Sequence, residues 1–334
     1  MSSPLAYVVA NPSKPAATGT LRRRLDAALQ TAGYQVRHLL TTPQSPGKLQ
    51  ARQALDAGAG LVVVAGGDGT LRCVAGELAN TTVPMGILPL GTANLAARSL
   101  GIPVGGRRAQ IEAIKLLCGK GRTQPVDLGW VRTDLAAGTW HPCLTVSGMG
   151  FDADLVASTR SRLKGHAGWL AYAVAALGNL HGPRLDFELS LSGSPGTSTS
   201  TSTSTSLPPE RLRARTVLVA NGGRLPAKID LLPQARMDDG VLDVAAIDVR
   251  GSLAGWSNLA AQVLLPQAGW RERPRLSSIR TRRGSAVVLH CERPVAVQVD
   301  GDLLPPTECL QMRIDPAALQ VLLPNSGAST RSTL

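Results

Sequence analysis

The stretch of sequence that decides the fold is LVVVAGGDGTL, residues 61–71. Residues 61–64 are apolar and mostly β-branched, which is typical of a strand buried inside a parallel sheet. Gly66, Gly67 and Gly69 predict a sharp turn after that strand, and Thr70 is placed to cap a following helix. Because glycines let backbone N–H groups approach an anion and a helix start favours negative charge, this turn suits a phosphate group.

Asp68 adds a negative charge to this expected phosphate-binding turn. A carboxylate beside a phosphate is repelled unless a cation bridges the two groups or the carboxylate orders nearby donors, so Mg²⁺ is implied. A glycine turn after a strand can also be a plain tight turn, and the stretch alone leaves both interpretations open. The string GGDGT fits neither the P-loop nor the dinucleotide-binding fingerprint.

The composition indicates a globular protein large enough for two domains, with 334 residues of which 43% are hydrophobic. Aromatic residues make up only 3% of the chain, which argues against stacking platforms for single-stranded nucleic acid. The five cysteines are widely spaced and form no CxxC pair, so neither a disulfide framework nor a zinc site is predicted. This cysteine usage fits a reducing, cytoplasmic environment.

No signal peptide or membrane span is predicted, and we expect a soluble protein. The longest smooth apolar run, Trp169–Leu177, is far too short to cross a bilayer. The net charge of +12 is uneven, since residues 1–125 carry 14 Lys and Arg against 5 Asp and Glu. A basic surface can attract nucleotide or an anionic membrane, although a high arginine content can also reflect a GC-rich genome.

Strands and helices alternate through the first part of the chain. The pattern predicts strands at 5–10, 35–40, 61–65 and 83–88, with helices at about 19–32, 46–58 and 71–79. This alternation is typical of a parallel α/β sheet. Asn11, Thr41 with Thr42, and Gly66–Thr70 follow three of these strands and should meet at the sheet edge where such folds bind ligands.

Short polar residues flank the predicted elements. Ser13 or Thr18 can cap the first helix. A second turn, PLGTAN at 89–94, follows the fourth strand, and we expect Thr92 and Asn94 to offer their side chains to the same cleft as the first turn.

The second part of the chain is predicted to be a β-rich, sandwich-like domain. Alternating runs indicate strands at 144–147, 185–191, 216–220, 242–249, 286–290, 296–299 and 310–314. A Thr/Ser-rich segment at 194–206 and a polar tail at 326–334 have compositions that cannot form a core. The predicted domains are therefore residues 1–125 and 126–325.

GGDGT followed by PLGTANLA at 89–96 resembles the catalytic domain of the diacylglycerol and sphingosine kinase family, whereas NAD kinases share only the first motif. The remaining segments that resemble this family follow in order along nearly the whole chain: VDLG at 126–129, GMGFDA at 148–153, Lys164–Tyr172, NGG at 221–223, DDGVLD at 238–243 and DGD at 300–302. Leu95, Ala96 and Asp302 depart from residues usual in the family, and the first two put its lipid specificity in question.

The resemblance implies a three-layer α/β nucleotide-binding domain, similar to those of NAD kinases and phosphofructokinases, followed by a β-sandwich-like domain. It implies a lipid kinase that uses ATP and Mg²⁺ to phosphorylate diacylglycerol, giving phosphatidic acid. A kinase for sphingoid bases, ceramide or another long-chain alcohol is the first alternative. A non-catalytic lipid-binding or regulatory protein on the same fold is the second.

The resemblance also implies roles for individual residues. Asp300, expected to be exposed at a strand end, would be the general base, although Asp-Gly is also a common hairpin turn. Asp68 would act in catalysis, and Asp239 with the backbone carbonyls of Arg236 and Val241 would hold a structural Mg²⁺. The residues expected to bind ATP are Asn11, Thr41, Thr42, Gly66, Gly67, Asp68, Gly69, Thr70, Leu71, Arg72 and Thr92.

A lipid kinase without a transmembrane segment must dock reversibly on a membrane surface. The basic clusters expected to contribute are Arg22–Arg24 and Arg107–Arg108. No nucleic-acid partner is expected, and a homodimer is compatible with the sequence.

Overall fold

The computed structural model describes residues 3–134, 138–151, 184–193, 208–222, 232, 234–249 and 277–325. The chain forms two compact units, residues 1–128 with 316–334 and residues 129–315. Strands β5 (Gly121–Thr133) and β14 (Asp302–Pro324) both run through the boundaries between these units. The predicted boundary lies at 125/126, and the sequence pattern did not indicate that residues beyond 315 return to the first unit.

Several predicted segments lie outside the described residues. They are Asp152 and Ala153 of the GMGFDA motif, the segment at 164–172 that resembles the family, the Thr/Ser-rich segment at 194–206, residue 223 of the NGG motif and the tail at 326–334.

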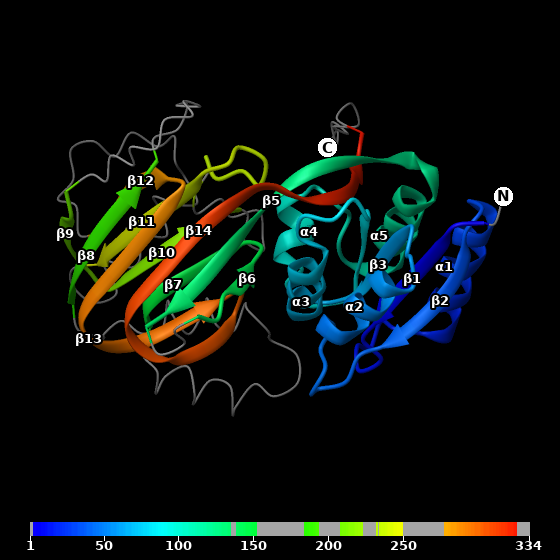
Figure 1. The fold of residues 1–334 in the computed structure, drawn as a ribbon, viewed down its shortest axis with the longest axis horizontal. Helices are drawn as coiled ribbons and strands as arrows, with labels where there is room; N and C mark the ends of the chain where they lie inside the picture. Colours follow the sequence, from blue (N-terminus) through cyan, green and yellow to red (C-terminus); the bar gives the residue numbers. More distant parts are fainter. Residues whose placement is uncertain are drawn as a thin grey trace. The chain divides into compact units, whose positions relative to one another are not determined.

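The first unit is built on a parallel sheet in the order β2-β1-β3-β4 (Figure 1). Its strands are β1 (Leu5–Ala10), β2 (Gln35–Leu40), β3 (Leu61–Gly66) and β4 (Met85–Pro89). The end of β14 extends this sheet, where Val321 pairs with Met85 in parallel. The four strands and the parallel α/β class predicted from the sequence are confirmed.

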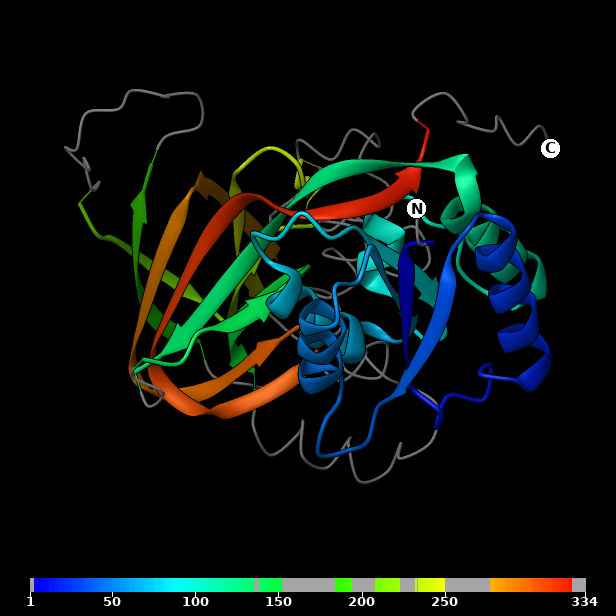
Figure 2. The same cartoon turned by 45° about the vertical axis from the view of Figure 1, so that its right-hand side comes forward.

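Helices connect these strands (Figure 2). They are α1 (Gly19–Thr31), α2 (Lys48–Asp56), α3 (Asp68–Leu78), α4 (Leu95–Ser99) and α5 (Gly106–Lys115), followed by the π-helical turn η1 (Leu116–Lys120). Helix α1 buries Leu21, Leu25 and Leu29, which recur every four residues on one face. Thr18 caps α1 by accepting a hydrogen bond from the Leu21 N–H at 3.2 Å, so the second of the two predicted capping residues is confirmed.

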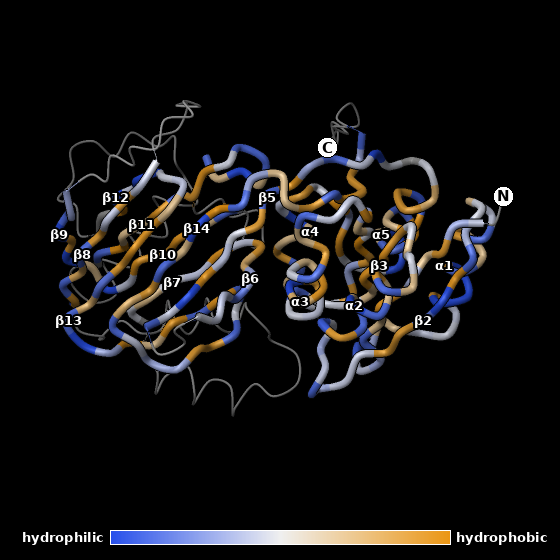
Figure 3. Tube along the Cα trace, in the orientation of Figure 1, coloured by the Kyte–Doolittle hydropathy of each residue, from blue (hydrophilic) through white to orange (hydrophobic). Residues whose placement is uncertain are grey.

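Strand β3 is buried along its whole length, as its continuous apolar sequence predicts. Figure 3 colours the chain by the hydropathy of each residue. The prediction for the following helix was wrong in one respect. Helix α3 begins at Asp68 after a Gly67 N-cap, and Thr70 lies buried inside the helix and is not its cap. The glycine turn is tighter than expected, because the helix starts within the GGDGT motif.

The second unit is antiparallel and sandwich-like, which confirms the predicted class. Its strands are β6 (His141–Cys143), β7 (Val146–Phe151), β8 (Leu185–Ser192), β9 (Glu210–Ala214), β10 (Thr216–Ala220), β11 (Leu242–Val249), β12 (Ser277–Gly284) and β13 (Ala286–Val299). One run of strands follows the order β12-β11-β10-β7-β13, and β8 pairs with both β13 and β9.

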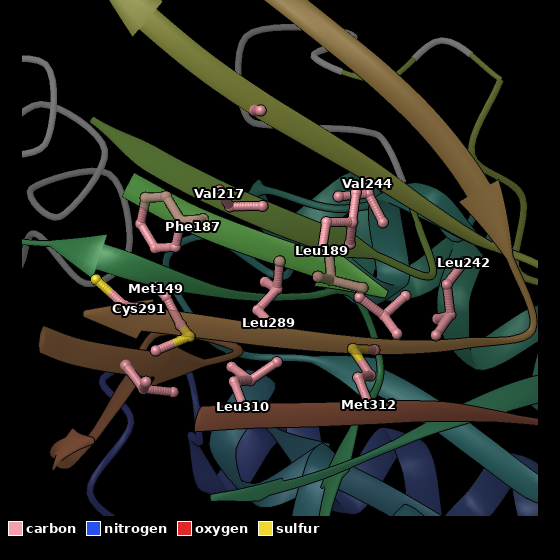
Figure 4. Packing of buried hydrophobic residues seen from close by; sticks show 14 of the residues in the cluster. Met149, Phe187, Leu189, Val217, Leu242, Val244, Leu289, Cys291, Leu310 and Met312 are labelled. Atoms are coloured by element: carbon pink, nitrogen blue, oxygen red, sulfur yellow. The ribbon is translucent and has the colours of Figure 1, made fainter. Parts of the chain in front are cut away.

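Strand β13 joins the two parts of this second unit. The sequence predicted two strands here, but the structure has one, with a register irregularity between His290 and Val295. The first half of β13 pairs with β8 and its second half pairs with β7. The irregularity lies between these two halves, where such a bulge bends a strand. Apolar side chains from β7, β8, β13 and β14 meet in the core between them (Figure 4).

Within the part of the chain that the structure describes, no helix is long and apolar enough to cross a membrane.

Candidate functional site

The strand order of the first unit predicts that a ligand binds beside β1 and β3. The chain goes from β1 to β2 on one side and then to β3 on the other, so the order reverses between β1 and β3. Ligands of open α/β sheets bind outside the carboxyl ends of the strands at such a reversal. The Asn11 N–H donates to the Ala65 carbonyl at 3.0 Å and the Thr41 N–H donates to the Ala10 carbonyl at 2.9 Å. The residues predicted to follow these strands therefore lie at one edge.

The two glycine turns of this edge touch each other. A Cβ atom at Gly91 would lie 2.8 Å from the Gly67 Cα, which is closer than side chains tolerate. The Leu90 N–H donates to the Gly66 carbonyl at 2.8 Å, which fixes the second turn against the first. The GGDGT and PLGT motifs thus meet backbone to backbone at Gly67 and Gly91, where a Cβ atom at either position would be crowded. Glycine backbone of this kind at a helix start suits a phosphate group.

Asn94 does not face the cleft as the sequence predicted. It is buried, with a left-handed backbone (φ +48), and its side chain closes its own turn. Its Oδ1 accepts from the Gly91 N–H at 2.9 Å and its Nδ2 donates to the Gly91 carbonyl at 2.7 Å. The expectation was wrong because a short amide side chain satisfies its own local backbone before it reaches solvent.

Asp68 is the first residue of α3, where the helix dipole favours a carboxylate. Its Oδ1 accepts a hydrogen bond from the Ala96 N–H at 3.3 Å, at the start of α4. The carboxylate therefore orders a local donor, which is one of the two ways in which a negative charge can persist beside a phosphate site. This bond also ties the helices that follow the two glycine turns.

Lys14 is a site residue that the sequence reasoning missed. A side chain built at Gly67 would begin 3.5 Å from the Lys14 Cε and 3.7 Å from its Nζ, so the ammonium group lies over the glycine turn. Asn11 shapes the loop that carries Lys14, since its Oδ1 accepts from the Ser13 N–H at 3.0 Å and from the Ser13 Oγ at 2.7 Å. The only signal in the sequence was a lysine four residues after the end of a predicted strand. Its position over the glycine turn is visible only in the structure.

The other residues expected to bind ATP differ in exposure. Thr42 and Thr92 are exposed, and the Thr42 Oγ1 accepts from the Ser45 N–H at 3.1 Å. Thr41, Thr70 and Leu71 are buried, so these three support the edge through backbone and packing. Gly69 and Arg72 are intermediate.

Asp300 forms the turn between β13 and β14 together with Gly301. Both residues have left-handed backbones, φ +48 and φ +89, and the turn is closed by the pair Val299 and Asp302. The Asp-Gly hairpin that the sequence allowed is confirmed, and such a two-residue turn requires positive φ at both positions.

The expectation that Asp300 is exposed was wrong, because only 8% of the residue is accessible. Its Oδ2 accepts from the Leu144 N–H at 2.7 Å, and its Oδ1 accepts from the Thr145 N–H at 2.8 Å, the Thr145 Oγ1 at 2.6 Å and the Val146 N–H at 3.1 Å. The side chain folds back onto these backbone donors at the start of β7, and both carboxylate oxygens are engaged there.

Asp239, whose carboxylate was expected to hold a structural metal, lies in the second unit beside Arg283, which also pairs with Asp243. The Asp239 Oδ1 accepts from the Val241 N–H at 3.2 Å, and the Asp239 Oδ2 lies 2.5 Å from an Arg283 Nη. The Arg283 Nε donates to the Asp243 Oδ1 at 3.0 Å. Burial raises the pKa of the Asp243 carboxyl, and the Arg283 charge opposes that rise. Within the described residues, no three His, Cys, Asp or Glu side chains gather as a metal site would require.

Comparison with known proteins identifies the family. Residues 5–131 match the family model of the diacylglycerol kinase catalytic domain, and residues 145–323 match that of the YegS C-terminal NAD kinase beta sandwich-like domain. A diacylglycerol kinase of Mycobacterium tuberculosis is 30% identical over 88% of this chain and 83% of its own length. The chain belongs to the diacylglycerol kinase and YegS-like lipid kinase family. The resemblance predicted from the sequence motifs is thereby confirmed.

Other lipid kinases of the family agree with this assignment. A protein of Stenotrophomonas maltophilia named "Probable lipid kinase YegS-like" is 28% identical, covering 87% of this chain and 88% of its own. The crystal structure of a diacylglycerol kinase from Bacillus anthracis matches with a TM-score of 0.68, covering 97% of this chain and 98% of that one. At 19% identity, this structural match supports the fold alone.

Proposed function

We propose that this lipid kinase transfers the γ-phosphoryl group of ATP to the hydroxyl of diacylglycerol, giving phosphatidic acid. Membership of a kinase family with a nucleotide-binding fold implies the use of ATP. The observation that carries the proposal is the contact between the Gly67 and Gly91 turns, with the Lys14 ammonium group beside them. Backbone N–H groups and one cation at a strand-order reversal suit the phosphates of a nucleotide.

The relatives differ in whether their names specify the lipid. The Mycobacterium tuberculosis relative is named a diacylglycerol kinase, whereas the YegS-like relatives are named only as lipid kinases. The departures at Leu95 and Ala96 gave the sequence-based reason for doubting diacylglycerol, but both residues are buried in α4. Their side chains are therefore not offered to a lipid, and this reason loses its weight.

The residues of the first unit position the phosphates and neutralise their charge, which is most of what phosphoryl transfer needs. Lys14 and the N–H groups of the glycine turns act on the phosphate oxygens. Asp68 would hold the Mg²⁺ that accompanies ATP, since it is only half-buried and stands at the turn itself. When bound, Mg²⁺ adds positive charge at the transferring phosphoryl group.

Asp300 of the second unit is proposed as the proton acceptor for the lipid hydroxyl. Its carboxylate is fixed by four short bonds from residues 144–146, which gives it one well-defined orientation. Asp302, two residues further on and partly exposed, is the alternative acceptor, because both oxygens of Asp300 already accept hydrogen bonds.

The test of the proposed function is an assay of the purified protein with labelled ATP, Mg²⁺ and mixed micelles that each contain one lipid. We expect labelled phosphatidic acid from diacylglycerol micelles. A higher rate with sphingosine, ceramide or a long-chain alcohol would replace diacylglycerol as the substrate. If no lipid is labelled under any condition, the protein is not a kinase of these acceptors and the non-catalytic interpretation stands.

Replacing Lys14 by methionine tests the nucleotide site. Methionine keeps an unbranched side chain that lacks only the terminal ammonium group, and a hydrogen bond to a charged group is worth about 1.5–3 kcal/mol. We therefore expect ATP to bind roughly 10–100-fold more weakly in Lys14→Met, measured by calorimetric titration. Lys48→Met is the matched control, because Lys48 is an exposed lysine paired with Glu77 at 3.5 Å. Equal affinity in both variants would remove Lys14 from the site.

Membrane docking through the first unit is a further expected property. Arg22–Arg24 on α1 and Arg107–Arg108 on α5 are exposed, and these two helices contact each other, so the two clusters belong to neighbouring elements. Each basic residue near an anionic surface contributes about 1 kcal/mol.

We expect sedimentation with vesicles to rise with anionic lipid content and to fall with added salt. The double variant Arg23→Glu with Arg108→Glu should weaken vesicle binding about tenfold or more. Arg280→Glu, an exposed arginine of the second unit, is the control. Vesicle binding that is independent of both the anionic lipid content and the salt concentration would show that these arginines are solvated surface residues without a role in docking.

A further inference from the structure

The second unit holds a charge cluster at the place where the family resemblance implies a structural Mg²⁺. The cluster consists of Asp239, Asp243 and Arg283. The implied metal ligands are the Asp239 carboxylate and the backbone carbonyls of Arg236 and Val241.

The residues as placed do not fit Mg²⁺. This ion needs a near-octahedral shell of oxygens at about 2.0–2.1 Å. One Asp239 oxygen accepts the Val241 N–H, and the other lies 2.5 Å from the Arg283 guanidinium. A positive group at hydrogen-bond distance from the carboxylate opposes a divalent cation at that same oxygen.

The neighbouring carboxylates are also paired with arginines. Asp238 accepts from the Arg236 side chain at 2.9 and 3.0 Å, and Asp243 accepts from Arg283 at 3.0 Å. Each of the three aspartates in the DDGVLD motif therefore has a guanidinium partner in the structure. A divalent ion at Asp239 would compete with the Arg283 guanidinium for the same carboxylate.

The position of Arg283 is fixed by the sheet. Strands β11 and β12 are antiparallel, and their register places Asp243 directly opposite Arg283. Opposite charges at such a cross-strand position stabilise the pair. Asp243 is only 2% exposed. Burying a charged carboxylate destabilises the folded state unless the carboxylate has a partner of opposite charge. The next residue, Arg282, is exposed and pairs with Glu210 of β9.

We propose that Arg283 serves as the structural cation of this site. Its guanidinium ties the loop carboxylate of Asp239 to the strand carboxylate of Asp243, and the loop is held without a bound Mg²⁺. The requirement for Mg²⁺ is then confined to the nucleotide. This inference goes beyond the proposed function, and stability measurements without nucleotide test it independently of any kinase activity.

The experiment is thermal unfolding of the full chain, without nucleotide, in EDTA and across a titration with MgCl₂. We expect the wild-type Tm to be the same in both. Arg283→Gln should lower the Tm by at least about 3 °C, because it leaves a buried carboxylate without its cation. The matched control Arg282→Gln removes an exposed pair from the same strand and should shift the Tm by less than about 1 °C.

Two results would overturn the proposal. The first is a wild-type Tm that rises with Mg²⁺ and loses that rise in Asp239→Asn, which would place a divalent ion at this loop. The second is an Arg283→Gln variant as stable as Arg282→Gln. If Arg283→Gln fails to fold, the comparison of wild type with Asp239→Asn in Mg²⁺ decides the question alone.

Discussion

Replacing Asp68 by alanine is expected to lower phosphoryl transfer by at least about 100-fold while the protein stays folded. The loss of a preorganised electrostatic group at a transferring phosphoryl costs about 10²–10³-fold. The substitution removes one half-buried carboxylate at the start of α3 and no core volume. The measurement is kcat with diacylglycerol micelles, together with thermal unfolding of the same preparation.

Two further variants separate the contributions of Asp68. Asp68→Asn keeps an oxygen that can accept the Ala96 N–H and removes the charge, so it isolates the electrostatic part of the effect. Asp56→Ala removes an exposed carboxylate from the same unit and should leave turnover unchanged. Near-normal turnover in Asp68→Ala would exclude this residue from the mechanism. A collapse of stability in Asp68→Ala would show that its bond to α4 is its main role.

Replacing Asp300 by asparagine is expected to lower both turnover and stability. General-base catalysis contributes about 10²–10⁴-fold, and we expect kcat to fall within that range while ATP affinity is kept, because the nucleotide is held by the first unit. The structure adds a second effect. An amide NH₂ would face donors now satisfied by carboxylate oxygens, and an unsatisfied buried donor costs about 1–3 kcal/mol.

The assay for Asp300→Asn therefore needs kcat, ATP affinity and thermal unfolding on the same protein, with kcat corrected for the folded fraction. Thr145→Val is a useful comparison, because it removes one hydroxyl donor to the Asp300 Oδ1 and leaves the carboxylate in place. It should reduce stability more than turnover. Asp302→Asn, from the same turn, tests the alternative proton acceptor.

A corrected decrease smaller than tenfold in Asp300→Asn would leave Asp300 as a hairpin residue that anchors residues 144–146. If Asp302→Asn shows the large decrease, the proton acceptor is Asp302. Either result would leave the nucleotide site of the first unit in place, since that site rests on other residues.

The sequence by itself determined the four parallel strands β1–β4 of the first unit, the helices α1, α2 and α3, and the family. A strand covered on both faces must be apolar throughout. Strand β3 is a continuous run of apolar residues, which can be recognised in the sequence without a structure. The turns after β3 and β4 could also be recognised in the sequence, because glycines directly after a strand predict a sharp turn. Local patterns of this kind depend on neighbours within a few positions.

The tertiary structure decided where the charged side chains point. The position of Lys14 over Gly67 depends on how the loop after β1 folds across to the turn after β3. The burial of Asp300 depends on the backbone of Thr145, which is 155 residues earlier in the chain. The Asp-Gly sequence predicts the hairpin turn, but it does not predict which distant backbone donors the Asp300 side chain contacts.

The same distinction explains the cluster around Arg283. The DDGVLD motif suggests a cation site, and the resemblance supplied Mg²⁺ as the cation. Only the pairing of β11 with β12 reveals that Arg283, 44 residues beyond Asp239, lies at those carboxylates. Strand register is set by the packing of whole sheets, and a shift of one residue would turn Arg283 to the other face. The choice between a metal and an arginine is therefore made by long-range packing, which the local sequence does not encode.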